Sequence, residues 1–220
     1  MDEFVGTTPI FPLPLGALLP GELLPLHIFE PRYRRMLEDM RKGDRMLGIA
    51  TLMPGHDDEN GNPPIADVVG IGRLIKDRTN PDGTSDIVLK GVLRGEVTGE
   101  VQGQPYRQAL VRLHPEAEEH AALAFRRRRA LLGGLADAVP HGELQYDITA
   151  EFQPGGLVDR IAASLELTAG DRVTMLQALS VDVRIEGLLL LLEQDRHRAK
   201  LATLVPSLAE YSLELRTPRP

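Results

Sequence analysis

The sequence predicts an α+β protein with a β-rich N-terminal part and a helical C-terminal part. Between residues 45 and 113, short apolar segments alternate with glycines and turn residues, at the spacing of strands in a small sheet. From residue 116 the composition changes to Ala, Leu, Glu and Arg, residues typical of helices. The predicted organisation is therefore a β-rich subdomain at 1–115, a helical subdomain at 116–206 and a tail at 207–220.

Proline and leucine dominate the first 30 residues. Pro12, Pro14, Pro20 and Pro25 recur within this stretch. Proline lacks a backbone N–H and breaks helices, so a helix is excluded here. Sheets tolerate proline mainly in edge strands, and we therefore expect short edge strands joined by turns.

A helix is predicted at 31–42. Pro31 suits its first position, where no N–H is needed for an intrahelical bond. The apolar residues follow the i, i+3, i+4, i+7 template, namely Tyr33, Met36, Leu37 and Met40. Gly43 can supply the C-terminal cap.

Five stretches downstream have the apolar pattern of strands. They are 46–52, 68–75, 87–93, 97–101 and 109–113. Glycines inside strands, such as Gly70 and Gly72, mark bends and bulges. Short, glycine-rich strands at this spacing predict a small, strongly coiled sheet or a barrel.

The first half of the helical subdomain is predicted to be a helix at 116–138 followed by a linker at 140–156, which contains several prolines and glycines. Four consecutive arginines, Arg126–Arg129, sweep about 300° of a helix and cannot form one narrow stripe. We interpret them as a solvated helix face rather than as a contact for phosphate or nucleic acid.

Three shorter helices are expected after the linker. The first carries one apolar face, formed by Leu157, Ile161 and Leu165. Thr168, with Asp171 three residues later, has the spacing of a capping box for the second helix. Ser180 can cap the third, whose apolar stripe comprises Val181, Ile185, Leu188 and Leu192.

Composition excludes several classes of protein. The chain of 220 residues contains no cysteine, which excludes disulfides, thiolate metal sites and a cysteine nucleophile. Its net charge is −7 and it has only five Phe, four Tyr and no Trp, so nucleic acid is not expected as a partner. No apolar run approaches the roughly 20 residues that span a bilayer, so we expect a soluble, cytoplasmic protein without a membrane partner.

The motifs of common enzyme classes are missing. No Gly-Lys pair is available for a phosphate-binding loop, and Gly70 and Gly72 lack the third glycine of a dinucleotide fingerprint. None of the five serines lies in a G-x-S-x-G nucleophile elbow. We therefore predict no catalytic residues and no cofactor.

Two segments resemble metal sites incompletely. His27 and Glu30 have i, i+3 spacing, but Pro31 begins the helix after them, so we expect His27 to pack at a strand end and Glu30 to lie near the positive helix N-terminus. The segment 56–62 fits a calcium loop poorly, because a histidine stands at the first ligand position and Asp67 at the position of the bidentate glutamate. We predict no metal site.

A specific motif lies in the proline-rich segment. Phe11-Pro12-Leu13-Pro14-Leu15 is followed by Pro20-Gly21 and then by Leu24-Pro25-Leu26-His27-Ile28-Phe29-Glu30-Pro31-Arg32-Tyr33. The pattern resembles the N-terminal, substrate-binding domain of Lon proteases. Three further segments agree with the resemblance: 70–74, Leu89-Lys90-Gly91-Val92-Leu93-Arg94, and the closing helices at 165–192 with Arg184. The similarity runs from about Ile10 to about Gln194.

The resemblance implies a PUA-like pseudo-barrel followed by a helical bundle. It also implies mainly structural roles for the motif residues, which are Pro12, Pro14, Pro25, His27, Phe29, Glu30, Pro31, Arg32, Tyr33 and Arg184. The ATPase and Ser-Lys protease modules of Lon are not found in the chain, so we expect a stand-alone, non-enzymatic protein of bacterial type.

Polypeptide binding is the function that the resemblance favours. We predict a non-catalytic module for unfolded or extended polypeptides, an adaptor or holdase in protein quality control, with a protease as a possible partner. The alternative is a small-molecule or nucleic-acid binder that uses the barrel cleft. An exposed edge of the proline-rich strands is one candidate binding surface, although we expect most of their leucines, namely Leu13, Leu15, Leu24 and Leu26, to fill the core. No oligomeric state is predicted.

Overall fold

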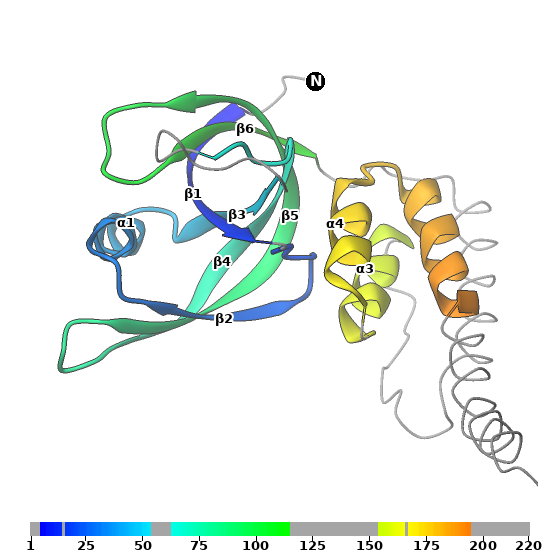
Figure 1. The fold of residues 1–220 in the computed structure, drawn as a ribbon, viewed down its shortest axis with the longest axis horizontal. Helices are drawn as coiled ribbons and strands as arrows, with labels where there is room; N and C mark the ends of the chain where they lie inside the picture. Colours follow the sequence, from blue (N-terminus) through cyan, green and yellow to red (C-terminus); the bar gives the residue numbers. More distant parts are fainter. Residues whose placement is uncertain (1–4, 15, 54–62, 115–153, 166, 195–220) are drawn as a thin grey trace, which may run out of the picture.

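A computed structural model describes residues 5–14, 16–53, 63–114, 154–165 and 167–194. A β-rich part precedes a group of helices, which confirms the predicted α+β class (Figure 1). The strands are β1 (Val5–Pro14), β2 (Leu23–Ile28), β3 (Met46–Leu52), β4 (Val68–Thr79), β5 (Ser85–Val101) and β6 (Gln108–His114). The helices are α1 (Pro31–Lys42), α3 (Pro154–Ser164), α4 (Ala169–Gln177) and a helix at 181–194.

Five of the strands pair in a closed ring. The sheet order is β2-β5-β4-β3-β1-β6, and β6 pairs back with β5. The β1–β3 pair is parallel, whereas the other pairs of the described strands are antiparallel. Strand β5 is long enough to serve two neighbours, since Ser85–Lys90 pairs with β2 and Arg94–Val101 pairs with β6. Closure leaves β2 as an edge strand beside the ring.

The expectation of short edge strands is wrong for β1. This strand is a member of the ring, with Val5–Pro9 paired to β6 and Ile10–Pro14 paired to β3. Among the described strands, each half of β1 has a partner on one side only. A proline is tolerated where its nitrogen, which carries no N–H, lies on the side without a partner. The expectation holds for β2, which carries Pro25.

Strand β5 also differs from the prediction, which divided it into 87–93 and 97–101. Gly95 lies between these stretches inside one continuous strand. A Cβ atom at Gly95 would lie 2.2 Å from Cγ1 of Val111 on β6. The glycine therefore marks a close approach of two packed strands rather than a strand end.

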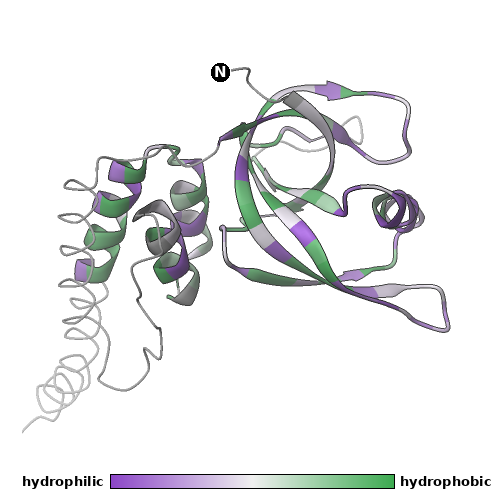
Figure 2. Cartoon of the chain, turned by 180° about the vertical axis from the view of Figure 1, so that it is seen from behind, coloured by the Kyte–Doolittle hydropathy of each residue, from purple (hydrophilic) through white to green (hydrophobic). Residues whose placement is uncertain are grey.

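The predicted helix at 31–42 is confirmed as α1. Its apolar stripe is buried against the ring, where Met36 and Leu37 contact a cluster that includes Leu47 and Ile49 of β3. The Gly43 N–H closes the helix by donating to the carbonyls of Asp39 and Met40. Hydrophobic and hydrophilic residues interleave along the strands of the ring, as a sheet with one buried face requires (Figure 2).

The helical part agrees with the prediction except at its start. Pro154, predicted to lie in the linker 140–156, begins α3, because proline is tolerated in the first turn of a helix. The predicted cap of α4 is confirmed, since the Asp171 N–H donates to Oγ1 of Thr168 at 3.2 Å. The third helix begins at 181 after Ser180. The predicted helix 116–138, the arginine run, the calcium-like segment 56–62 and the tail fall on residues that the structure does not describe.

The segment 16–22, between β1 and β2, lies between the ring and the helices and contacts both. A Cβ atom at Gly70 or Gly91 would lie 2.1 Å from the carbonyl oxygen of Leu18 or Leu19, respectively. Glycine at these positions therefore lets the backbone of the segment approach β4 and β5. Leu19 is fully buried and packs with helix residues that include Val158 and Leu188. Within the described residues, no helix is long and apolar enough to cross a membrane.

Candidate functional site

The motif residues divide between the core and the surface. Pro12 and Pro14 pair with Ala50 and Leu52 in the β1–β3 ladder. Tyr33 is buried, and its ring centroid lies 4.4 Å from that of Phe11. Burial raises the pKa of Tyr33, although the Arg32 guanidinium, 4.6 Å from the centre of its ring, acts in the opposite direction.

Phe29 takes the opposite position, on the surface. It is 60% exposed, and its ring stacks on that of His27 with centroids 6.1 Å apart. An exposed aromatic ring beside the end of β2 is an apolar surface that no core contact explains.

His27 and Glu30 belong to different ion pairs. Nδ1 of His27 lies 2.7 Å from Oδ1 of Asp86 on β5, whereas Oε2 of Glu30 accepts a 2.9 Å hydrogen bond from Nε of Arg32. The His27 hydrogen bond, followed by one from Asn80, lowers the pKa of Asp86. Among the described residues, no cluster of three acidic or histidine side chains could hold a metal ion.

The outward-facing side chains of β2, β5 and β4 form one continuous surface, here called the outer face. Cross-strand register places Leu23 beside Lys90 and Arg73, Pro25 beside Val88 and Lys76, and His27 beside Asp86 and Arg78. The alternate residues point to the core, where Leu24 and Leu26 pack partly buried against the ring cluster and Ile28, Ile87 and Leu89 are buried. The core expectation is thus confirmed for Leu24 and Leu26, and also for Leu13, while Leu15 lies outside the described residues.

The centre of the outer face is apolar. Leu23 is 57% exposed and Pro25 is exposed, while Val88 is half-buried between them and β4. A shallow depression of about 770 Å³ lies over this centre, and its lining combines apolar residues with charged ones and a histidine: Pro25, Leu26, Ile87 and Val88 with His27, Lys76, Asp77, Arg78 and Asp86. Ile75, 42% exposed, stands next to it at the bulge between Leu74 and Lys76. Apolar side chains held on a paired sheet offer a preformed contact surface.

The open edge of β2 is less suited to binding than its face. The Gly91 N–H donates to the Glu22 carbonyl at 2.8 Å. In an antiparallel pair every second residue forms the hydrogen bonds to the neighbouring strand, so Glu22, Leu24 and Leu26 are the residues whose backbone faces β5. Pro25 lies between them, and its backbone faces the open edge. Because proline has no N–H, this edge cannot offer a complete ladder to another strand.

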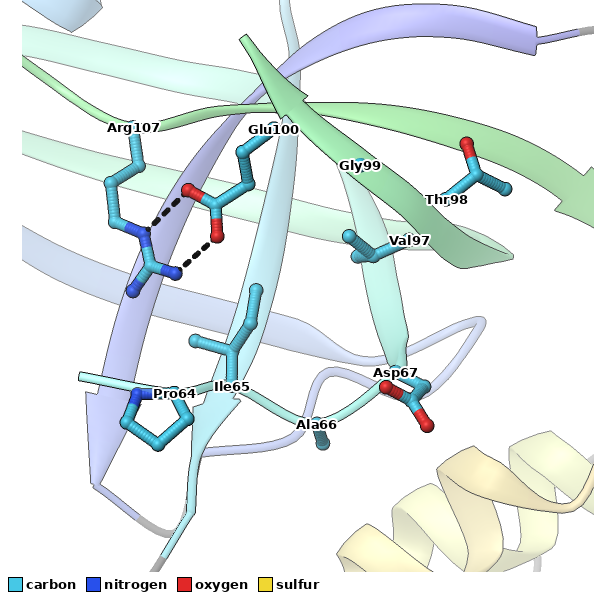
Figure 3. A pocket seen from close by; sticks show the side chains of 9 residues that line it. All are labelled: Pro64, Ile65, Ala66, Asp67, Val97, Thr98, Gly99, Glu100 and Arg107. Carbon is cyan, nitrogen blue, oxygen red and sulfur yellow. Dashed lines mark hydrogen bonds and ion pairs between the residues drawn. The ribbon is translucent and has the colours of Figure 1, made fainter. Parts of the chain in front are cut away.

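A second depression, of about 490 Å³, lies between the segment 64–67 and residues 97–100 of β5, with Arg107 at its border (Figure 3). Val97 N–H donates to the Asp67 carbonyl at 2.7 Å and fixes this segment. The guanidinium of Arg107 donates to both carboxylate oxygens of Glu100 and, at 2.7 Å, to the Pro63 carbonyl. Figure 3 shows this ion pair at one end and Thr98 at the other. The cation that lines the depression is therefore already engaged.

A buried ion pair joins the ring to the helices. Both outer nitrogens of Arg94 on β5 donate to the Asp159 carboxylate of α3 at 2.6 Å, and Nε donates to the Leu176 carbonyl at 3.0 Å. Nε of Arg184 lies 3.8 Å from the same carboxylate. Arg184 is thus buried at the joint between ring and helices.

The geometry of a closed ring followed by helices agrees with a family comparison. A model of the ATP-dependent protease La (LON) substrate-binding domain matches residues 7–194 of the chain. The chain belongs to the LON substrate-binding domain family. The match confirms the resemblance of the motif that ends at Tyr33.

Relatives of this LON substrate-binding domain include a Lon protease of Roseiflexus castenholzii, 27% identical over 196 residues, and Lon protease 2 of Myxococcus xanthus, 25% identical over 216 residues. The alignments cover 86% and 94% of this chain, but 24% and 26% of the two relatives. The chain thus spans about a quarter of the length of these relatives.

Two solved structures have the same fold. A Lon N-terminal domain protein from Xanthomonas campestris is 24% identical, with a TM-score of 0.57 over 84% of this chain and 97% of that chain. The N-terminal domain of the Mycobacterium avium complex Lon protease is 18% identical, with a TM-score of 0.64 over 86% of this chain and 98% of that one. Both likenesses place the LON substrate-binding domain in the Lon N-terminal fold.

Two features of the LON substrate-binding domain were not found by sequence reasoning. Asp159 lies between Val158 and Arg160 and carries no local signal of its partner Arg94, 65 positions away. The outer face is assembled from three strands, so no single stretch of sequence displays it. Its signal was the alternation of Leu23, Pro25 and His27 with the buried-side residues of β2.

Proposed function

We propose that this LON substrate-binding domain is a non-catalytic module that captures unfolded or extended polypeptides on its outer face. The observation that carries the proposal is the row of exposed apolar side chains, Leu23 and Pro25 beside Val88, on strands that are rigidly paired. Contact with an apolar segment would remove this surface from water, and apolar burial is the main source of affinity where no catalytic or metal chemistry contributes.

A face-binding mode fits the strand geometry better than strand addition. Pro25 interrupts the open edge of β2, so a client would gain few backbone hydrogen bonds there. Side chains on the outer face impose no such requirement. We expect weak affinity, in the range of about ten micromolar, because the contact area is small.

Quality control is the cellular role that we propose, as an adaptor or holdase with a protease as partner. The support is the family, since the relatives named Lon protease contain this domain as about a quarter of their length. The proposal also includes a PUA-like pseudo-barrel, supported by the closed ring of five strands. The division at 115/116 is proposed with it, and β6 ends at His114.

A small-molecule or nucleic-acid site at the depression of Figure 3 is the alternative. Its lining contributes the carboxylates of Asp67 and Glu100 and a guanidinium that Glu100 and Pro63 already hold. Two carboxylates repel a phosphate backbone, and an engaged arginine offers it little. The polypeptide proposal is therefore preferred.

Titration of a labelled, permanently unfolded polypeptide tests the proposal by fluorescence anisotropy. Saturable binding is expected at tens of micromolar, and the L23S variant should weaken it about fivefold because one apolar contact is lost. The matched control is L110S, which changes an exposed leucine of β6 away from the outer face and should leave affinity unchanged. Equal affinities for all three proteins, or no saturable binding, would contradict the proposal. ATPase or peptidase activity that disappears with a point mutation would contradict the non-catalytic assignment.

A further inference from the structure

The outer face is strongly cationic within an acidic protein. Arg73, Lys76 and Arg78 of β4 and Lys90 of β5 are all exposed. Within the described residues, none of the four takes part in an ion pair. The chain as a whole has a net charge of −7, so this concentration of positive charge is a local property of the face.

The neighbouring carboxylates neutralise these cations only in part. Among the described residues, Asp86 is the carboxylate on the outer face; it is held by His27 at 2.7 Å and by Asn80 at 3.0 Å, and it also attracts Arg78. Asp77 lies opposite Ile87 on the other side of the sheet, where Arg41 of α1 binds both of its oxygens at 2.6 Å. Within the part of the chain that the structure describes, the four exposed cations thus outnumber the nearby carboxylates, Asp77 and Asp86, which already have hydrogen-bond partners.

Charge and apolar surface are arranged side by side. The apolar residues Leu23 and Pro25 lie on β2, three cations lie on β4, and β5 with Val88 runs between them. The cations Arg73 to Arg78 span about 17 Å at the rise of a strand, the length of about five extended residues. In an extended chain, successive side chains point to opposite sides. A client lying along β5 would therefore turn every second side chain toward β2 and the others toward β4.

We propose that the outer face selects extended segments in which apolar and acidic residues alternate. Apolar side chains would cover Leu23, Pro25 and Val88, while carboxylates would pair with Arg73, Lys76 and Arg78. This inference rests on the proposed function and specifies its client class. Charges elsewhere on the protein lie beyond the Debye length of about 10 Å at 0.1 M salt for much of the surface, so the local cations dominate the encounter.

Three labelled hexapeptides provide the test, with leucine at alternate positions and glutamate, glutamine or lysine between. At low salt the glutamate peptide should bind the full chain about tenfold more tightly than the lysine peptide, with the glutamine peptide between them, since three weak surface pairs form or clash. At high salt the affinities of the glutamate and lysine peptides should approach that of the glutamine peptide, because salt screens the charges. The affinity of the glutamine peptide should stay the same, because apolar contact is not screened.

Charge variants locate the effect. R73Q/K76Q/R78Q should abolish the preference for glutamate and leave the affinity for the glutamine peptide unchanged. K76Q alone should reduce the preference, whereas the control K42Q, an exposed lysine at the end of α1, should not alter it. These cations are solvent-exposed, so unfolding is not expected to interfere; circular dichroism checks this.

The outcomes separate the two proposals. Equal binding of the three peptides, with loss in L23S, would overturn the acidic preference and retain the polypeptide module. No binding of any peptide, or of the unfolded polypeptide, would overturn the proposed function itself. Displacement of the glutamate peptide by a single-stranded oligonucleotide at lower concentration would overturn the acidic-peptide assignment in favour of nucleic acid.

Discussion

Arg94 of β5 and Asp159 of α3 form a two-fold hydrogen-bonded ion pair in which each side chain is 2% exposed. The pair lies where the ring of strands meets the helices, and Arg94 also donates to the carbonyls of Met175 and Leu176 at the end of α4. Ring and helices are thus joined by a buried polar contact, whose charged groups would be costly to bury without each other.

Loss of one charge from this pair should be costly. D159N leaves the Arg94 guanidinium buried without its counterion, so we expect the free energy of unfolding to fall by about 3–5 kcal/mol in urea denaturation. The double variant R94M/D159L, which removes both charges of this pair and keeps Arg184 as D159N does, should cost less than D159N alone. The control E38Q breaks an exposed pair with Arg35 and should cost below about 1 kcal/mol. A loss for D159N equal to that for E38Q would contradict the structural role.

Two glycines of β5 should respond differently to alanine. At Gly91 a Cβ atom would lie 2.1 Å from the Leu19 carbonyl oxygen, so G91A must displace the segment 16–22 between the ring and the helices. We expect a loss of about 1–3 kcal/mol in the free energy of unfolding. At Gly99 the nearest atom would be 3.8 Å away, and G99A should be close to neutral. Thermal denaturation of both variants makes the comparison, and similar melting temperatures would disprove the close approach.

The Arg41–Asp77 pair should make stability depend on acid pH. The Arg41 hydrogen bonds lower the pKa of Asp77 from its ordinary value of 3.8. A carboxyl whose pKa is lowered by folding contributes stability above its unfolded pKa and loses it as the pH falls through its folded pKa. R41Q should therefore be less stable than wild type by about 1 kcal/mol at neutral pH, and the difference should shrink below pH 3.8.

The control for this titration is K76Q, which removes a neighbouring cation of β4 that has no carboxylate partner in the described structure. Its stability relative to wild type should stay constant through the same pH range. A pH-independent difference for R41Q would show that the pair contributes packing rather than charge.

Tyr106 should make stability depend on alkaline pH. Burial, together with the hydrogen bond that its hydroxyl donates to Asp39, raises the pKa of Tyr106 to about 12. A folded state that holds this proton above the ordinary pKa of 10.0 loses stability as the pH rises from 10 to about 12. Y106F lacks this proton, so the stability advantage of wild type should decline over that range. Tyrosinate absorbance of wild type and Y106F, followed against pH, provides the check. If the tyrosine that is missing from the Y106F titration has a pKa near 10, the assignment is wrong.

Several features of this LON substrate-binding domain follow from sequence alone. The helix at 31–42 and the Thr168 cap depend on contacts between residues three or four positions apart, so the local pattern contains their determinants. The missing nucleotide-binding and nucleophile motifs, and the motif ending at Tyr33, are likewise readable as linear strings. These features defined the class of the fold and the family.

Tertiary structure alone decided the ring, the joint and the outer face. Val5 pairs with Arg112, and Arg94 with Asp159, across separations that no local pattern encodes. The length of β5 was also decided by tertiary structure. Gly95 interrupts the apolar pattern in the sequence, but in the structure it is the point where Val111 of β6 packs closely. The outer face exists because bulges and register set Leu23, Val88 and Lys76 on one side of three strands. Strand partners are chosen by burial and hydrogen bonding between distant segments, and these terms are realised only when the chain has closed on itself.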